Sequence, residues 1–152
     1  MSTRCQIAFY EKDAELSNPK VILYRHSDGY PSSVLTEMMP FLAWFSRVSD
    51  IEYTSARLLQ YLTNLYDQYT VSWDSTSEEE KETTKKWTGV LGYGISKAFH
   101  WDIEYIYAIK ADCVEVHSVL MGDTVTDNAK LLGTIPLKDF EQSKDYQKLI
   151  TE

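Results

Sequence analysis

Apolar and polar residues alternate at the beginning of the chain. Residues 4–10 place Cys5, Ile7 and Phe9 on one side and the intervening residues on the other, which predicts a half-buried strand. A second alternating segment covers residues 20–25 after a polar, turn-forming stretch. The two segments together predict an antiparallel hairpin.

Helical spacing replaces this alternation in the next part of the chain. Apolar positions across residues 34–48 recur every three or four residues, which predicts a helix capped by Ser32 or Ser33. A second helix is predicted for residues 49–69, because a capping box of Ser, Asp, Ile and Glu opens it and one apolar stripe continues along it. The two helices follow each other almost directly, so we expect a compact helix pair.

Strand periodicity returns in the second half of the sequence. Residues 91–96, 103–109 and 113–120 alternate, and a tight connection joins the last two as a hairpin. Residues 72–88, rich in Glu, Lys, Ser and Thr, are expected to form an acidic surface insertion. Residues 121–152 are expected to form a loop and a short terminal helix.

The predicted order of elements is therefore ββααβββ followed by a C-terminal tail. This order predicts an α+β fold, with a mainly antiparallel sheet of about five strands and the helix pair packed on one face. A chain of 152 residues with 43% hydrophobic residues is long enough for one core. We expect a single domain that spans residues 1–152.

Charge and composition narrow the classes of function. The formal net charge is −8 and the isoelectric point is near 4.9, so the chain repels a phosphate backbone and no nucleic-acid partner is expected. The sequence has no run of 18 apolar residues and no basic leader, so no membrane partner is expected. Cys5 and Cys113 are interpreted as buried thiols in a reducing compartment, which favours a cytoplasmic location.

The densest polar cluster is residues 24–31, where a strand is predicted to end and a helix to begin. A guanidinium, loop amides and a helix N-terminus would converge there, as in a pocket for a phosphate or another anion. The candidate ligand-binding residues of this cluster are Arg25, His26, Asp28 and Tyr30. The alternative is structural: Arg25 pairs with Asp28 or Glu104 and only holds the turn.

A second cluster combines small and aromatic residues. Gly92 and Gly94 flank Tyr93, and a bare glycine face lets a flat ligand approach the backbone closely. Tyr93 and Trp101 are candidates for stacking on a base. The alternative is that the glycines make room for the helix pair and the rings pack against the sheet.

Metal binding and catalysis receive less support from the residue pattern. His26, Asp28, His100 and Asp102 are all predicted near strand ends, but their spacing matches no metal-ligand motif. His100 with Asp102 or Glu104 could form an acid–base pair, although nothing distinguishes this pair from an ordinary sheet edge. No catalytic residue, metal or cofactor is therefore assigned.

Two segments carry a resemblance to a known family. Residues 24–31, Tyr-Arg-His-Ser-Asp-Gly-Tyr-Pro, precede a helix pair and residues 102–107, Asp-Ile-Glu-Tyr-Ile-Tyr. Across about residues 5–70 and 90–118 this pattern resembles the Thoeris anti-defence sponge family of phage proteins. The 72–88 insertion and the long tail depart from it.

The resemblance implies a binding function without catalysis. Proteins of that family bind cyclic ADP-ribose isomers in pockets between subunits, some also bind cyclic oligonucleotides, and they sequester the immune signal without cleaving it. It implies a homo-oligomer in which Arg25 contacts phosphate and Tyr93 and Trp101 stack on the ligand. Two alternatives stay open: an acidic phage protein that inhibits a nucleic-acid-binding defence protein by direct contact, and a small nucleotide-processing enzyme.

Overall fold

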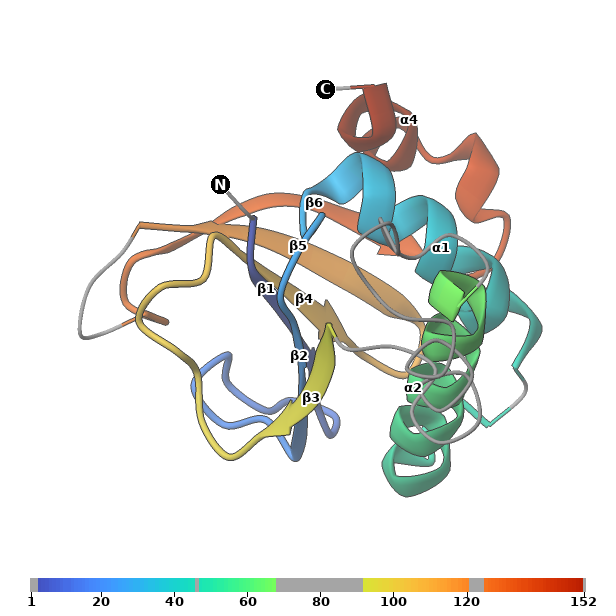
Figure 1. The fold of residues 1–152 in the computed structure, drawn as a ribbon. Coiled ribbons are helices and arrows are strands. Elements are labelled where there is room, and N and C mark those ends of the chain that lie inside the picture. Colours follow the sequence, from blue (N-terminus) through green and yellow to red (C-terminus); the bar gives the residue numbers. More distant parts are fainter. Residues whose placement is uncertain (1–2, 46, 68–91, 121–124, 152) are drawn as a thin grey trace, which may run out of the picture.

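A mixed six-stranded sheet forms the centre of the molecule (Figure 1). The computed structural model describes residues 3–45, 47–67, 92–120 and 125–151. The strand order across the sheet is β3-β2-β1-β4-β5-β6. The strands are β1 (Cys5–Phe9), β2 (Val21–Arg25), β3 (Tyr93–Ser96), β4 (Tyr105–Ile109), β5 (Cys113–Val119) and β6 (Ala129–Pro136).

Both predicted hairpins are confirmed, because β1 pairs with β2 and β4 with β5 in antiparallel, and the two hairpins join through one parallel contact. Neighbouring strands are antiparallel except for β1 and β4, which pair in parallel with Cys5 opposite Tyr105. Both β1 and β4 lie in the middle of the sheet, and all five residues of β1 are buried. The parallel pair brings the beginnings of β1 and β4 to the same end of the sheet, where β2 ends.

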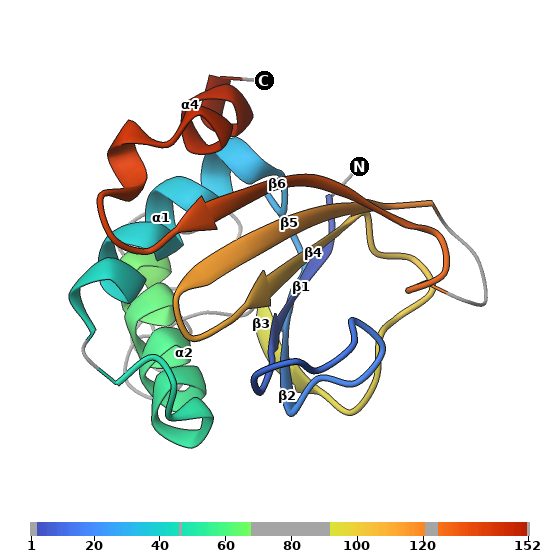
Figure 2. The ribbon, with the colours of Figure 1, turned by 180° about the vertical axis from the view of Figure 1, so that it is seen from behind.

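Three helices of the described residues cover one face of the sheet. These are α1 (Pro31–Trp44), α2 (Ile51–Asp67) and α4 (Lys144–Thr151), and the opposite views in Figures 1 and 2 place all of them on the same side. The main core lies beneath them, where fully buried residues such as Leu35 and Met38 of α1 meet Ile7 and Phe9 of β1. This arrangement confirms the α+β class and the helix pair on one face.

The other face of the sheet is covered by loops instead of helices. A second core gathers around Ala8, Ile22 and Ile106, and the connections after β1 and before β4 contribute Tyr10 and Ile103 to it. These loops lie opposite the helices in Figures 1 and 2. Side chains of the central strands therefore face either the helices or the loops.

The C-terminal part contains more regular structure than the sequence predicted. The loop expected within residues 121–152 is partly wrong, because β6 pairs with β5 and adds a sixth strand. After β6 come a 3₁₀ turn, η2 (Phe140–Gln142), and α4, in place of one helix over this segment. The beginning of β6 is exposed or half-buried and contains two adjacent leucines, so its side chains do not show the alternation that marks a strand.

Two further expectations concern the acidic insertion and membrane-spanning segments. The 72–88 insertion lies outside the described residues. Within the part of the chain that the structure describes, no helix combines the length and the apolar character needed to cross a bilayer.

Candidate functional site

Arg25, the predicted phosphate contact, lies on the helix-covered face and is 1% exposed. Its Nη1 forms an ion pair with Glu37 of α1 at 2.5 Å and donates to the Tyr93 hydroxyl at 2.9 Å. Its Nε donates to the Ser27 carbonyl oxygen at 2.9 Å and its Nη2 to the Ser33 hydroxyl at 3.3 Å. The guanidinium thus joins the end of β2 to α1 and β3.

This environment explains the electrostatics of the buried pair. Burial opposes the charge of Arg25, but Tyr93 and Glu37 outweigh that effect and keep the pKa of the guanidinium above its ordinary value. The pKa of the Tyr93 hydroxyl is also above its ordinary value, and there burial itself is the main cause. Arg25 forms an ion pair with Glu37, a partner that the structural alternative did not name. A phosphate would have to displace Glu37 to reach it.

The turn after β2 is fixed by close backbone contacts. Gly29 donates from its amide to the Thr3 carbonyl oxygen at 2.9 Å and accepts from the Tyr107 hydroxyl at 2.6 Å. A Cβ on Gly29 would lie 2.9 Å from the Cβ of Cys5, so only glycine fits. Asp28 and Tyr30 are exposed on this turn, with 3.5 Å between the Tyr30 hydroxyl and Asp28 Oδ1.

Strand alternation separates the two predicted neighbours Arg25 and His26. Successive side chains of a strand point to opposite faces, so Tyr24 and His26 face the loops while Arg25 faces the helices. The Tyr24 hydroxyl and His26 Nδ1 are 2.9 Å apart and form a hydrogen bond. The structure thus brings Arg25 and Tyr93 together but places His26 and Trp101 elsewhere.

A second set of rings gathers on the loop-covered face. The ring of Tyr24 lies between two imidazoles, with centroids 6.0 Å from His26 and 4.8 Å from His100. Trp101, which follows His100, is 64% exposed. We call the surface formed by Arg4, Tyr24, His26, His100 and Trp101 the ring face.

A buried amide holds the loop that carries His100 and Trp101. Gln6 of β1 is fully buried, and its Nε2 donates to the Ala98 carbonyl oxygen at 3.1 Å. Its Oε1 accepts from the His100 amide at 2.8 Å. Both ends of the side chain are therefore used to fix the backbone of the loop before β4.

Arg4 contributes a partly exposed guanidinium to the ring face. Its Nη1 donates to Asp102 Oδ2 at 3.0 Å, and the Arg4 and Asp102 side chains are 35% and 22% exposed. Burial raises the pKa of the Tyr24 hydroxyl, while Arg4 acts in the opposite direction. Arg4 is thus the cation that this face can offer to an anion.

Arg4 was not among the site residues predicted from the sequence, because the pairing of the two hairpins with each other was not predicted. The parallel pairing of β1 with β4 places the residues before both strands side by side, and the Glu104 amide donates to the Arg4 carbonyl oxygen at 2.9 Å. The available signal was that Arg4 and Asp102 both precede buried strands and carry opposite charges.

A cavity opens beside the ring face. It has a volume of about 480 Å³, within the range of small-molecule sites. Its lining residues are Phe99, His100, Trp101, Asp102 and Val125. Tyr24 is paired with Gly94 of β3. The space beside this glycine-containing segment is empty, because a Cβ on Gly92 or Gly94 would meet nothing within 4 Å. The arrangement offers flat faces, one carboxylate and one guanidinium.

The metal interpretation receives no support from the geometry. Among the residues described, no group of three or more His, Cys, Asp or Glu side chains is arranged to hold a metal ion. His26 is bonded to Tyr24, and Asp102 is paired with Arg4.

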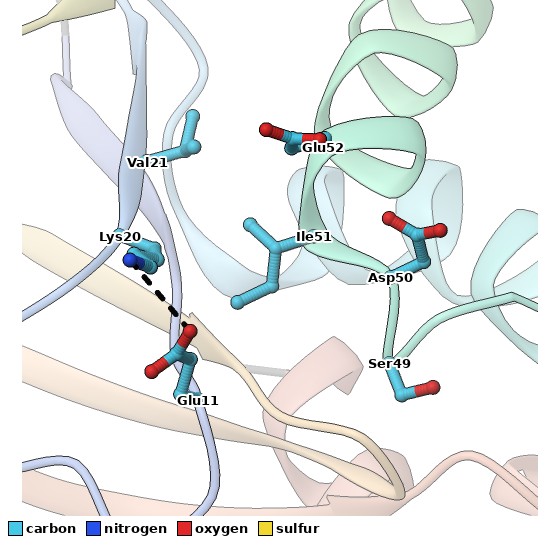
Figure 3. Close-up of a pocket in the computed structure, with 7 residues that line it drawn as sticks. All are labelled: Glu11, Lys20, Val21, Ser49, Asp50, Ile51 and Glu52. Carbon is cyan, nitrogen blue, oxygen red and sulfur yellow. Dashed lines mark ion pairs between the residues drawn. The ribbon is translucent and has the colours of Figure 1, made fainter.

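A larger cleft of about 530 Å³ lies between the beginning of β2 and that of α2. Figure 3 shows Ile51 pointing into this space toward the strands, with Lys20 and Glu11 on the opposite wall. Lys20 Nζ lies 3.7 Å from Glu11 Oε1, and Asp50 and Glu52 add further carboxylates. The cleft contains none of the predicted site residues, and its charges are mixed.

Comparison of this chain with protein-family models, with curated proteins and with solved structures finds no match.

Proposed function

We propose that the protein binds a nucleotide-derived immune signal at the ring face and sequesters it unchanged. The observation that supports this proposal is the joint presence of an exposed indole, a partly exposed guanidinium and a cavity of about 480 Å³ on one anchored loop face. A nucleotide needs these two features, a flat surface for its base and a cation for its phosphate.

Stacking supplies the first part of the interaction. Trp101 lines the cavity and is exposed, so a base can lie against its indole. Base–aromatic stacking contributes about 1–3 kcal/mol for each base. Because the Gln6 amide holds the loop, little conformational entropy is lost when the ligand binds.

Charge supplies the second part. Arg4 is the guanidinium of this face, while Arg25 is enclosed by Glu37 and Tyr93 on the other side of the sheet. We therefore propose Arg4 for the phosphate contact that the resemblance implied for Arg25. The rings of His26 and His100 lie near that of Tyr24 and add N–H donors.

The identity of the ligand and the mode of action come from the family resemblance. It suggests a cyclic ADP-ribose isomer or a cyclic oligonucleotide, held in pockets between subunits of a homo-oligomer in the host cytoplasm. The open glycine strand beside Tyr24 leaves room for a second subunit to complete such a pocket. Sequestration without cleavage would counter a bacterial defence system by lowering the concentration of its signal.

Thermal shift measurements with cyclic ADP-ribose isomers and cyclic dinucleotides test this proposal. One compound should raise Tm, because a ligand at a hundred times its Kd stabilises the folded state by about 2.7 kcal/mol. Trp101→Ala should weaken binding by roughly fivefold to 150-fold. The matched control is Trp44→Ala, since Trp44 is 76% exposed at the end of α1 and should be silent.

The fate of the ligand separates the proposed function from its alternatives. A sequestered compound should be recovered intact by mass spectrometry after heat denaturation of the protein. An altered product would indicate an enzyme and contradict sequestration. Absence of any thermal shift across the panel, with capture of a basic defence nuclease, would instead support an acidic protein inhibitor.

A further inference from the structure

Asp102 is the carboxylate that lines the ring-face cavity. Three ring-bearing residues come directly before it in the sequence, and all three, Phe99, His100 and Trp101, line the same cavity. A base stacked on Trp101 would therefore present its edge to a wall that contains this carboxylate. The proposed function explains the rings and the guanidinium but assigns no role to Asp102.

The position of Asp102 is set by contacts on both of its sides. Arg4 Nη1 donates to Oδ2 at 3.0 Å, and the Arg4 carbonyl oxygen accepts from the Glu104 amide at 2.9 Å. On the preceding side, the Gln6 Oε1 holds the His100 amide at 2.8 Å. Preorganised groups of this kind give hydrogen-bond selectivity, because they do not reorganise to accept a wrong ligand.

We infer that Asp102 recognises the exocyclic amino group of the bound base. An ionised carboxylate only accepts hydrogen bonds, so it accepts from an amino group and repels a keto oxygen at the same position. The ligand would thus carry an amino-bearing base such as adenine. This inference rests on the proposed function, since it needs a nucleotide at the ring face.

The arrangement of Arg4 supports the same assignment. Its guanidinium pairs with the carboxylate, so Asp102 can remain ionised beside the base without an uncompensated charge. The Oδ2 atom accepts from Arg4, and within the described residues no hydrogen bond to Oδ1 is recorded. One oxygen thus fixes the carboxylate and the other is available for the ligand.

Cyclic ADP-ribose and its hypoxanthine counterpart, cyclic IDP-ribose, test this inference by titration calorimetry. In both compounds N1 of the base carries a ribose. The adenine compound therefore offers its exocyclic amino group as the donor on that edge, whereas the hypoxanthine compound has a keto oxygen there, which is an acceptor. The wild-type protein should bind the adenine compound at least tenfold more tightly. Asp102→Asn should remove or reverse that preference, because its amide can donate to the keto oxygen.

Asp50→Asn is the matched control. Asp50 also accepts from an arginine Nη at 3.0 Å, that of Arg47, but it lies at the beginning of α2. This variant should keep the tenfold preference. If Asp102→Asn does not fold, equal binding of the two compounds by the wild-type protein would still overturn the inference.

Failure of the inference and failure of the proposed function give different results. Equal binding of both compounds, with affinity still lost in Trp101→Ala, would overturn the role of Asp102 and leave the ring-face site standing. Absence of binding by either compound would overturn both for this class of ligand. A tenfold preference that Asp102→Asn retains would also overturn the inference.

Discussion

Replacing Arg25 by Met should destabilise the protein without changing its surface. Arg25 is 1% exposed and bonds to Ser27, Ser33, Glu37 and Tyr93. Methionine fills part of the space of the arginine stem but has no donor for these four acceptors. The variant therefore isolates the polar contacts of the side chain from most of its packing.

The expected loss follows from the exposure of the partner. Removing one member of a buried ion pair costs about 3–5 kcal/mol. The Glu37 side chain is 24% exposed, so water can partly solvate its carboxylate and the cost should fall near the lower end, about 3 kcal/mol. For a chain of this size each kcal/mol corresponds to about 2–4 °C. Arg25→Met should thus lower Tm by about 6–12 °C.

Calorimetric unfolding and urea titration of matched variants measure this effect. Arg57→Met on α2 is the control, because Arg57 is exposed, bonds only to Gln60 in the described part of the chain and should change stability by about 0.5 kcal/mol or less. Glu37→Gln and the double variant complete a cycle with a coupling of about 1 kcal/mol or more.

A small effect would refute this structural role. If Arg25→Met melts within about 2 °C of the wild-type protein, Arg25 does not join β2 to α1. Loss of ligand binding in such a stable variant would return Arg25 to the role of phosphate contact. The prediction therefore distinguishes a buried ion pair from a ligand site.

Three further results are expected. Gln6→Leu should leave the backbone amide of His100 unpaired and lower the free energy of unfolding by about 1–3 kcal/mol. Calorimetry should also show weaker ligand binding, and unchanged binding would contradict the anchoring role of Gln6. Burial raises the pKa of Tyr10 and Tyr107, so the stability that depends on their neutral form is complete below about pH 10 and is lost as pH rises. Absorbance at 295 nm should show that these tyrosines ionise only when the protein unfolds. Reversible ionisation in the native state would contradict this prediction. Burial, Asp112 and Glu115 raise the pKa of the Cys113 thiol to about 11, so at pH 8 roughly one thiol in a thousand is ionised. Iodoacetamide should therefore alkylate Cys113 slowly, as mass spectrometry would measure. Fast labelling would contradict the raised pKa.

The alternation of apolar residues predicted five of the strands, and their three-four spacing predicted the helix pair. It did not predict β6, which lies at the sheet edge and begins with exposed side chains such as Lys130 and Leu131. The register shift between Val116 and His117 also disturbs the regular pairing of β5 with β6. Alternation shows which residues are buried, but it does not show which strands pair or in which direction.

The candidate site was predictable only in part for the same reason. Trp101 and His26 were identified from the sequence and lie on the ring face, whereas Arg25 was grouped with His26 although adjacent strand residues face opposite sides. Applying that alternation to residues 20–25 already separates them. Arg4 required knowledge of the parallel β1–β4 pair, which is a contact between distant segments.

Nuclear magnetic resonance of the tryptophan indoles tests the central claim most directly. The chain has four Trp residues, and the Trp101 and Trp44 signals can be assigned by their disappearance in the alanine variants. On titration with a cyclic ADP-ribose isomer, the account predicts that the Trp101 indole signal shifts to saturation while that of Trp44 stays. A saturable change at Trp44 with Trp101 unmoved would contradict it.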